Sequence, residues 1–161
     1  MSESIQINIY SDGGYFEKQD IGGWGSVIFQ QDQELSRLSD WQKHTSSLEM
    51  ELKAAAKALE AVEQMINQQI KPDCQITLHT DSRILIEGLS QKIHLWRQNA
   101  WVHKSGNQVK YQALWESLEK FTLAYQVKWQ WVKGHNGNLG NTIADQLARE
   151  AVMQRIQANQ Q

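Results

Sequence analysis

Four carboxylates, each in its own short motif, are the residues of this chain best suited to chemistry. They are Asp12 before a pair of glycines, Glu51 in Met50-Glu51-Leu52, Asp81 in Thr80-Asp81-Ser82, and Asp145 in Asp145-Gln146-Leu147-Ala148. A histidine, His135, lies in a glycine-rich loop shortly before the last acid. Carboxylates suit hard divalent cations, and magnesium is the ion that joins carboxylates to phosphate oxygens. If the fold brings these acids together, the sequence predicts a metal site for phosphate chemistry.

Each acid taken alone has a simpler interpretation. Asp12 could begin an Asp-Gly turn, and Glu51 lies where a helix N-terminus favours negative charge. Asp81 could cap a short helix, and Asp145 could act as a capping partner for Thr142. Four acids brought together would repel one another strongly unless cations neutralised them. A shared metal site therefore explains the set, whereas separate caps explain only its members.

The periodicity of apolar residues predicts the elements that must position these acids. Alternation predicts strands at about 5–11, 23–31, 34–41, 75–80 and 126–132. Helical spacing predicts helices at about 46–67, 82–88, 91–100, 109–123 and from 142 to the end, the first with a capping box at Ser46 and Glu49. The final helix should turn Ile143, Leu147, Ala151 and Ile156 inward, and Asp12-Gly13-Gly14 should end the first strand in a turn. This order predicts an α/β fold whose mixed five-stranded sheet, three antiparallel strands then two more, is flanked by helices.

Length and composition are those of one globular domain spanning residues 1–161. No apolar run approaches the roughly 18 residues of a membrane helix, and the N-terminus lacks the basic and apolar regions of a secretory signal. With Cys74 as the single cysteine, we expect a cytoplasmic protein.

The net charge of −2 does not favour nucleic acid, but the charge distribution does. Residues 88–115 contain no Asp or Glu and carry a formal charge of +4, from Lys92, Arg97, Lys104 and Lys110, beside several tryptophans. A local basic patch with aromatic neighbours is typical of phosphate-backbone binding, although a solvated helical face without acids is equally consistent.

Together these motifs resemble the type 1, bacterial-type ribonuclease H family. The resemblance rests on Asp12-Gly13, Met50-Glu51-Leu52, Thr80-Asp81-Ser82, the run from Trp129 to His135, and Asp145-Gln146-Leu147-Ala148, in the family's order. It implies a ribonuclease H-like fold and endonucleolytic cleavage of the RNA strand of RNA–DNA hybrids, leaving a 5′-phosphate and a 3′-hydroxyl. The implied mechanism uses two Mg²⁺ ions, with Mn²⁺ as a possible substitute.

The resemblance also implies a role for individual residues. The family's metal-binding carboxylates fall on Asp12, Glu51, Asp81 and Asp145, with Asp12 bridging both ions, and its mobile catalytic histidine falls on His135. Substrate contacts are expected from Gly13, Ser46, Ser47 and Arg83 beside the acids, and from Lys92 and Lys104 on the family's basic handle, here residues 88–115. The handle's tryptophans should form its packing core. We expect hybrid binding to be salt-sensitive, and the protein to be a monomer with no obligate protein partner and no membrane association.

Two departures from the family pattern leave the substrate open. Ser47 and Leu48 replace an Asn pair before the helix that carries Glu51, and Glu49 follows where a basic residue is common. The first hairpin, residues 15–20, also differs. One alternative is therefore a nuclease of the same fold acting on another duplex. The other is a nucleic-acid-binding module without catalysis, which would be expected to lose carboxylates that this chain keeps.

Overall fold

The computed structural model describes residues 4–68, 73–134 and 137–160. Its elements follow in the order β1 (Ile5–Phe16), β2 (Ile21–Gln30), β3 (Gln33–Lys43), α1 (Ser47–Gln68), β4 (Cys74–Thr80), α2 (Arg83–Glu87), the π-helical turn η1 (Gly88–Lys92), α3 (Ile93–Gln98), α4 (Gln112–Tyr125), β5 (Lys128–Trp131) and α5 (Leu139–Asn159). Within these residues, no helix combines the length and apolarity needed to cross a membrane.

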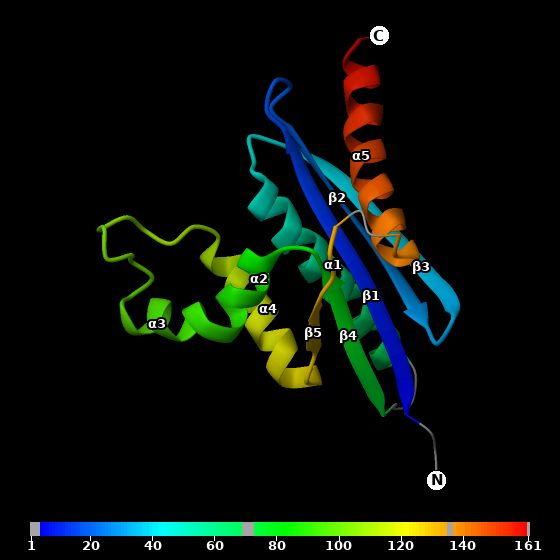
Figure 1. The fold of residues 1–161 in the computed structure, drawn as a ribbon, viewed down its shortest axis with the longest axis horizontal. Helices are drawn as coiled ribbons and strands as arrows, with labels where there is room; N and C mark the ends of the chain where they lie inside the picture. Colours follow the sequence, from blue (N-terminus) through cyan, green and yellow to red (C-terminus); the bar gives the residue numbers. More distant parts are fainter. Residues whose placement is uncertain (1–3, 69–72, 135–136, 161) are drawn as a thin grey trace.

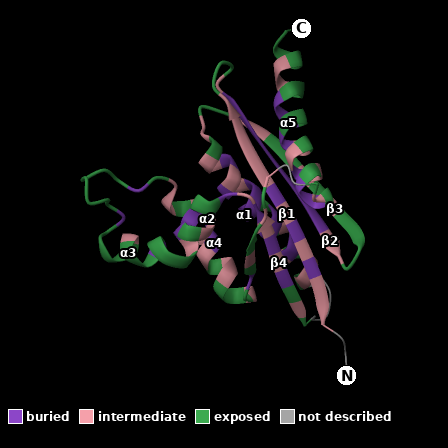
Figure 2. Ribbon diagram, viewed as in Figure 1, coloured by how far each residue is buried: buried purple, intermediate pink, exposed green. Residues whose placement is uncertain are grey.

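The five strands form one mixed sheet in the order β3-β2-β1-β4-β5, which confirms the predicted fold class. Strands β1, β2 and β3 are antiparallel neighbours, whereas β4 runs parallel to β1 and β5 parallel to β4. Helix α1 packs on one face of the sheet and α5 on the other (Figure 1). Buried residues accordingly run along β1, β2 and β4, the strands at the centre of the molecule (Figure 2).

Strand β1 is longer than its alternation predicts. Asp12 pairs with Gly25 and Gly13 with Trp24, and the pairing continues to Phe16 opposite Ile21. The predicted turn at Asp12-Gly13-Gly14 is therefore wrong. The glycines continue the strand because β2 supplies backbone partners for them, and the chain reverses only in the following residues 17–20.

Helix α1 begins close to its predicted start. The Ser46 hydroxyl accepts a hydrogen bond from the Glu49 backbone N–H at 3.1 Å, as a capping residue should. The Glu49 carboxylate, however, accepts from the Thr45 hydroxyl at 2.7 Å and so completes a different bond from the one a capping box predicts. Leu52 and Leu59 on this helix are fully buried in the main core.

Helix α5 differs from the prediction in both its start and its inner face. Asn138 caps it by accepting from the Asn141 backbone N–H at 3.0 Å, so the helix begins at Leu139 instead of Thr142. Its buried face carries mainly small residues: Gly140, Asn141, Ala144, Ala148, Ala151 and Val152. Of the four residues predicted to face inward, Ile143, Leu147, Ala151 and Ile156, only Ala151 is buried, and the other three are half-buried.

The handle projects away from the sheet and has a tryptophan core (Figure 1). Helices α2 and α3, predicted as separate pieces, form one continuous helical run through η1. The Trp96 ring lies 5.1 Å from the Trp115 ring and 5.9 Å from the Trp101 ring, centroid to centroid. A methyl group at Gly88 would lie 2.4 Å from Trp115, so the helical run packs directly on that ring. The predicted packing role of the tryptophans is therefore confirmed.

Candidate active site

Two elements bring Asp12 and Glu51 to the same place because the residue beside Asp12 has no side chain. A Cβ atom at Gly13 would lie 2.4 Å from the carbonyl carbon of Met50 and 2.5 Å from the Glu51 nitrogen. The backbone of α1 at Met50 and Glu51 therefore lies directly on the β1 backbone. Glycine at position 13 thus allows Glu51 to approach the carboxylate of Asp12.

A strip of glycines on β2 brings Asp145 to the same cleft. Cβ atoms at Gly23 and Gly25 would lie 2.3 Å and 2.6 Å from the carbonyl oxygens of Ala148 and Ala144, respectively. Helix α5 can therefore approach the sheet more closely than over larger side chains. Because Gly25 pairs with Asp12 in the sheet, this close approach places Asp145 beside Asp12.

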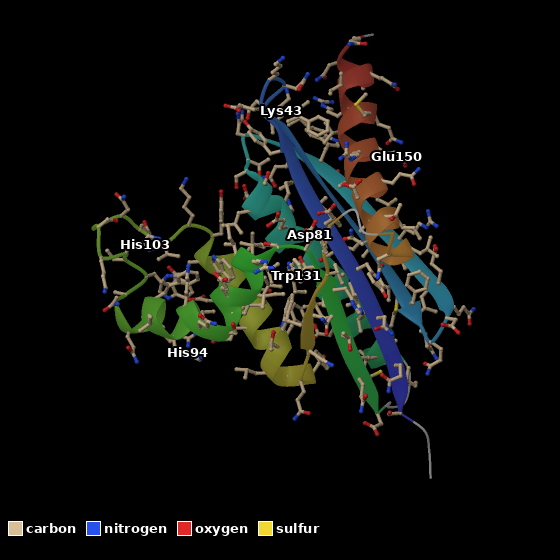
Figure 3. The ribbon with its side chains drawn as sticks, viewed as in Figure 1. Lys43, Asp81, His94, His103, Trp131 and Glu150 are labelled. Carbon is tan, nitrogen blue, oxygen red and sulfur yellow. The ribbon has the colours of Figure 1, made fainter. Side chains whose placement is uncertain are left out.

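Asp81 follows the last residue of β4, which runs parallel to β1. Its carbonyl oxygen accepts from the Trp131 indole N–H at 3.3 Å, and both residues are visible in Figure 3. A Cβ atom at Gly134 would lie 2.8 Å from an Asp81 carboxylate oxygen. The segment before His135 therefore contacts this acid, whereas His135 itself lies outside the described residues.

A cleft of about 230 Å³ unites these side chains. All four predicted acids line it, together with Gly13, Gly14, Phe16, Gly23, Ala148, Arg149 and Val152. The structure therefore brings Asp12, Glu51, Asp81 and Asp145 to one cavity, from four different elements of the chain.

Electrostatics in this cleft disfavours negative charge most strongly at Asp12. The pKa of Asp12 is raised from 3.8 to about 8. Burial is the largest cause, followed by the charge of Asp81 and then by a hydrogen bond and the charge of Asp145, whereas the hydrogen bond from the Gly13 N–H lowers the pKa by a smaller amount. The Gly13 N–H donates to Asp12 Oδ1 at 3.0 Å. Asp12 thus experiences the negative charge of both Asp81 and Asp145, and a cation in the cleft would relieve the repulsion among them.

The other acids have polar partners within the protein. Burial raises the pKa of Glu51, a hydrogen bond from the Ser82 hydroxyl lowers it, and the charge of Asp81 raises it further. Asp145 accepts from Arg149 Nε at 3.0 Å across one turn of α5. Arg149 was not anticipated from the sequence, although its i+4 spacing from Asp145 is a signal that could have suggested the pair.

The donor chemistry of the cleft fits hard divalent cations. All four side chains offer carboxylate oxygens, the ligands that Mg²⁺ and Ca²⁺ prefer. Across the described part of the chain, no three His, Cys, Asp or Glu side chains are already gathered as a ligand set. Small movements of side chains within the shared cleft would be needed to hold an ion, and mutual repulsion opposes them until a cation is present.

The residues predicted to contact substrate fall into two groups. Gly13 lines the cleft, and Arg83 is exposed nearby, with its guanidinium 4.3 Å from the centre of the Trp131 ring. Ser47 is exposed at the start of α1, but the Ser46 hydroxyl is already engaged by the helix cap and by the Tyr111 hydroxyl, 2.6 Å away.

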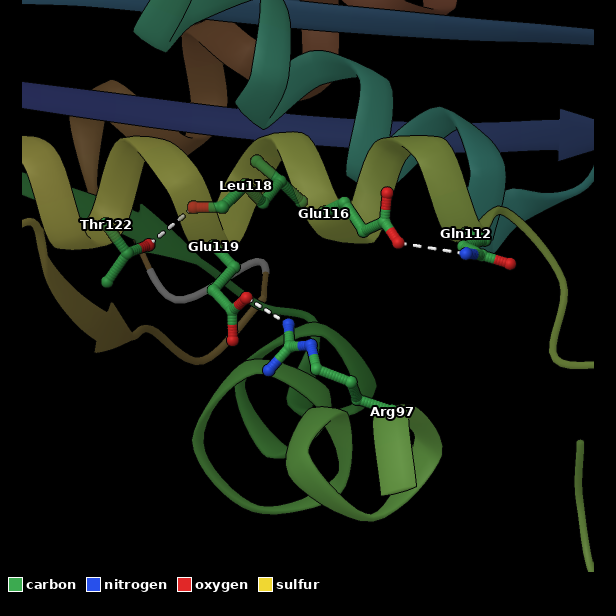
Figure 4. Close-up of polar contacts among 6 residues, drawn as sticks. All are labelled: Arg97, Gln112, Glu116, Leu118, Glu119 and Thr122. Carbon is green, nitrogen blue, oxygen red and sulfur yellow. Dashed lines mark hydrogen bonds and ion pairs between the residues drawn. The ribbon is translucent and has the colours of Figure 1, made fainter. Parts of the chain in front are cut away.

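Lys92 and Lys104 form the second group and lie exposed on the handle, apart from the four acids. Figure 3 shows the handle residues His94 and His103 well away from Asp81. Arg97, another of the four basic residues of the handle, forms an ion pair with Glu119 of α4 (Figure 4). The positive charge available at the handle surface is therefore smaller than the sequence predicts.

Comparison with known proteins decides the family. The sequence pattern of the RNase H family matches residues 4–153. The chain belongs to the RNase H family. Ribonuclease H of Bradyrhizobium diazoefficiens is 39% identical over 153 residues, covering 95% of this chain and 94% of the relative. Ribonuclease H of Francisella philomiragia is 38% identical over 143 residues, covering 89% and 88% of the two chains. These relatives confirm the predicted enzyme class, a ribonuclease H.

Solved RNase H structures share the fold at lower sequence identity. LC9-RNase H1, described as a type 1 RNase H with the type 2 active-site motif, superposes with a TM-score of 0.72 at 23% identity, covering 94% of this chain and 74% of that one. LC11-RNase H1, solved in complex with RNA/DNA hybrid, superposes with a TM-score of 0.67 at 20% identity, covering 93% and 99%.

Proposed function

We propose that this RNase H cleaves the RNA strand of RNA–DNA hybrids endonucleolytically, at the cleft formed by Asp12, Glu51, Asp81 and Asp145. The observation that carries the proposal is the convergence of these four acids from four elements on one cleft. A relative of the same fold has been solved with an RNA/DNA hybrid, which supports the choice of substrate.

We further propose Mg²⁺ as the cofactor, with Mn²⁺ able to replace it. When bound, a pair of such ions activates a water molecule and stabilises the leaving oxygen of an in-line displacement at phosphorus. Asp12 would hold the central position, because its carboxylate responds to both Asp81 and Asp145. The Ser82 hydroxyl near Glu51 and the Arg149 guanidinium on Asp145 limit the directions that these two carboxylates can take.

Selectivity for a hybrid requires recognition of both strands. The 2′-hydroxyl groups of the RNA strand distinguish it from DNA, and backbone N–H groups near Gly13 together with Ser47 and Arg83 are placed to contact them. The exposed Lys92 and Lys104 are placed to hold the phosphates of the DNA strand at the handle.

We also propose that the protein acts as a cytoplasmic monomer. The single cysteine supports a reducing compartment. The large exposed apolar side chains come from β3, α2, α3, α4, β5, α5 and, at Val102, the loop between α3 and α4, which supports a protein that needs no subunit partner.

A substrate panel tests the proposed function. End-labelled RNA–DNA hybrid, duplex RNA, duplex DNA and single-stranded RNA are incubated with Mg²⁺, Mn²⁺ or EDTA, and Asp81→Asn controls for contaminating nucleases. We expect metal-dependent cutting of the RNA strand of the hybrid alone. Cutting of another duplex by wild type and not by the variant would reassign the substrate, and no cutting by folded protein would refute the enzyme claim.

A further inference from the structure

The segment that carries the handle contacts the N-terminal end of α1 at both of its ends. At its beginning, the Ser82 hydroxyl caps α2 by accepting from the Leu85 N–H at 3.2 Å, and it is near enough to the Glu51 carboxylate to lower the pKa of that acid. At its end, the Tyr111 hydroxyl lies 2.6 Å from Ser46 Oγ. Ser46 and Glu51 are five positions apart at the N-terminal end of α1, and Glu51 lines the active-site cleft.

Tyr111 is held in an unusual conformation for this contact. Its backbone is left-handed, with φ 67° and ψ 35°, a region that residues other than Gly, Asn and Asp adopt rarely. It occupies the N-cap position of α4, yet its side chain makes no capping bond there. Its hydroxyl is directed instead to Ser46, the residue that caps α1.

The handle between these two ends is packed as one unit. Its tryptophan rings pack on one another, and Gly88 packs on Trp115 of α4. The ion pair between Arg97 and Glu119 ties α3 to α4, as Figure 4 shows. A displacement of a tightly packed element is transmitted to its attachment points, and the contacts of Ser82 and Tyr111 lie at the end of α1 that carries Glu51.

We propose that Tyr111 is a positioning residue, which couples the grip of the handle on the DNA strand to the placement of Glu51 in the cleft. The proposal rests on the proposed function. It acts through Ser46: when the handle is engaged, the Tyr111–Ser46 hydrogen bond holds the N-terminal end of α1, and with it Glu51, in place. Tyr111 itself does not line the cleft.

The chain offers a matched control for the missing hydroxyl. The Tyr125 hydroxyl donates to Glu63 Oε2 at 2.7 Å, so it also joins α4 to α1, but at the far end of both helices. Tyr111→Phe and Tyr125→Phe therefore each remove one tyrosine hydroxyl between the same two helices. Only the Tyr111 hydroxyl lies at the end of α1 that carries Glu51.

Kinetics on two hybrids tests the coupling. One hybrid is long enough to reach the handle, and the other spans only the cleft. The long-over-short ratio is kcat on the long hybrid divided by kcat on the short one. We expect Tyr111→Phe to lower this ratio by about threefold to tenfold, the effect of one hydrogen bond. Tyr125→Phe should leave this ratio at the wild-type value. In a double-mutant cycle, Tyr111→Phe should add nothing to Ser46→Ala.

Hydrogen exchange gives a second measurement that needs no catalysis. Amides of residues 47–51 should exchange faster in free Tyr111→Phe protein than in wild type or Tyr125→Phe, because the turn has lost one anchor. If wild type cuts no hybrid, the proposed function fails. If Tyr111→Phe also leaves exchange in residues 47–51 unchanged, the claim that Tyr111 anchors this end of α1 fails as well. With an active enzyme, a long-over-short ratio unchanged by Tyr111→Phe overturns the coupling, whatever the exchange shows.

Discussion

Replacing Asp12 by Asn should stabilise the metal-free protein, because a negative charge at this position is costly in the folded state. The pKa of Asp12 is raised from 3.8 to about 8 by burial and by Asp81 and Asp145. A group whose pKa rises on folding contributes stability that is present below its unfolded pKa and is lost as pH rises through its folded pKa. Wild type should therefore lose stability between pH 3.8 and about 8 in the absence of metal.

The size of the effect follows from the shift in the pKa of Asp12. At about 1.4 kcal/mol per pKa unit, the ceiling is roughly 5–6 kcal/mol above pH 8, and relaxation of the cleft should leave about 2 kcal/mol or more. For a domain of this size, 1 kcal/mol moves the melting temperature by about 2–4 °C. Asp12→Asn should thus melt about 5 °C or more above wild type at pH 8, and the gain should shrink toward pH 5.

Thermal melts in EDTA across this pH range measure the effect. Asn keeps the shape of Asp12 and can still accept from the Gly13 N–H, so the variant changes mainly the charge. Asp32→Asn, at an exposed position between β2 and β3, is the matched control and should not shift the melt. Mg²⁺ should stabilise wild type more than Asp12→Asn. An Asp12→Asn protein that melts at or below wild type at pH 8 would refute the reasoning.

Three further predictions concern the elements around the cleft. Replacing Lys92 and Lys104 by Ala should lower the slope of log affinity for hybrid against log salt by about 2, whereas Lys57→Ala should not change it; an unchanged slope would exclude phosphate contacts by the handle. Trp115→Ala, at a side chain 1% exposed, should cost about 3–5 kcal/mol in urea unfolding, and a loss below 1 would contradict the handle's tryptophan core. Ser82→Ala should cost about 1–2 kcal/mol through the lost cap of α2 and should reduce cleavage, and a variant with normal rates would deny that Ser82 orients Glu51.

The strand and helix order could be predicted because apolar periodicity records which face of each element is buried. Strand β1 past Ser11 could not, because its pairing depends on backbone groups of β2 that no side-chain pattern records. The prediction of which residues of α5 face inward was largely wrong for a related reason. Gly23 and Gly25 admit the helix so closely that Ala144 and Ala148 become the buried residues instead of larger neighbours.

The four acids could be predicted as a set, because their chemistry requires a shared counter-charge wherever they lie. Their partners could not. Arg149 and Ser82 act through contacts formed only in the fold, and the Tyr111 hydroxyl reaches Ser46 across 65 positions of sequence. The predicted substrate role of Ser46 was made without knowing that its hydroxyl already serves a helix cap and a second hydroxyl.

Cleavage by this protein requires the four acids to act as one centre, and one measurement tests this directly. Cleavage of a labelled RNA–DNA hybrid in Mg²⁺ is compared for wild type, Asp12→Asn, Glu51→Gln, Asp81→Asn, Asp145→Asn and the control Asp32→Asn, each shown to be folded. We expect the control to cut like wild type and all four cleft variants to fall to the level seen without enzyme. Wild-type cutting by Asp12→Asn or Asp81→Asn would contradict the account.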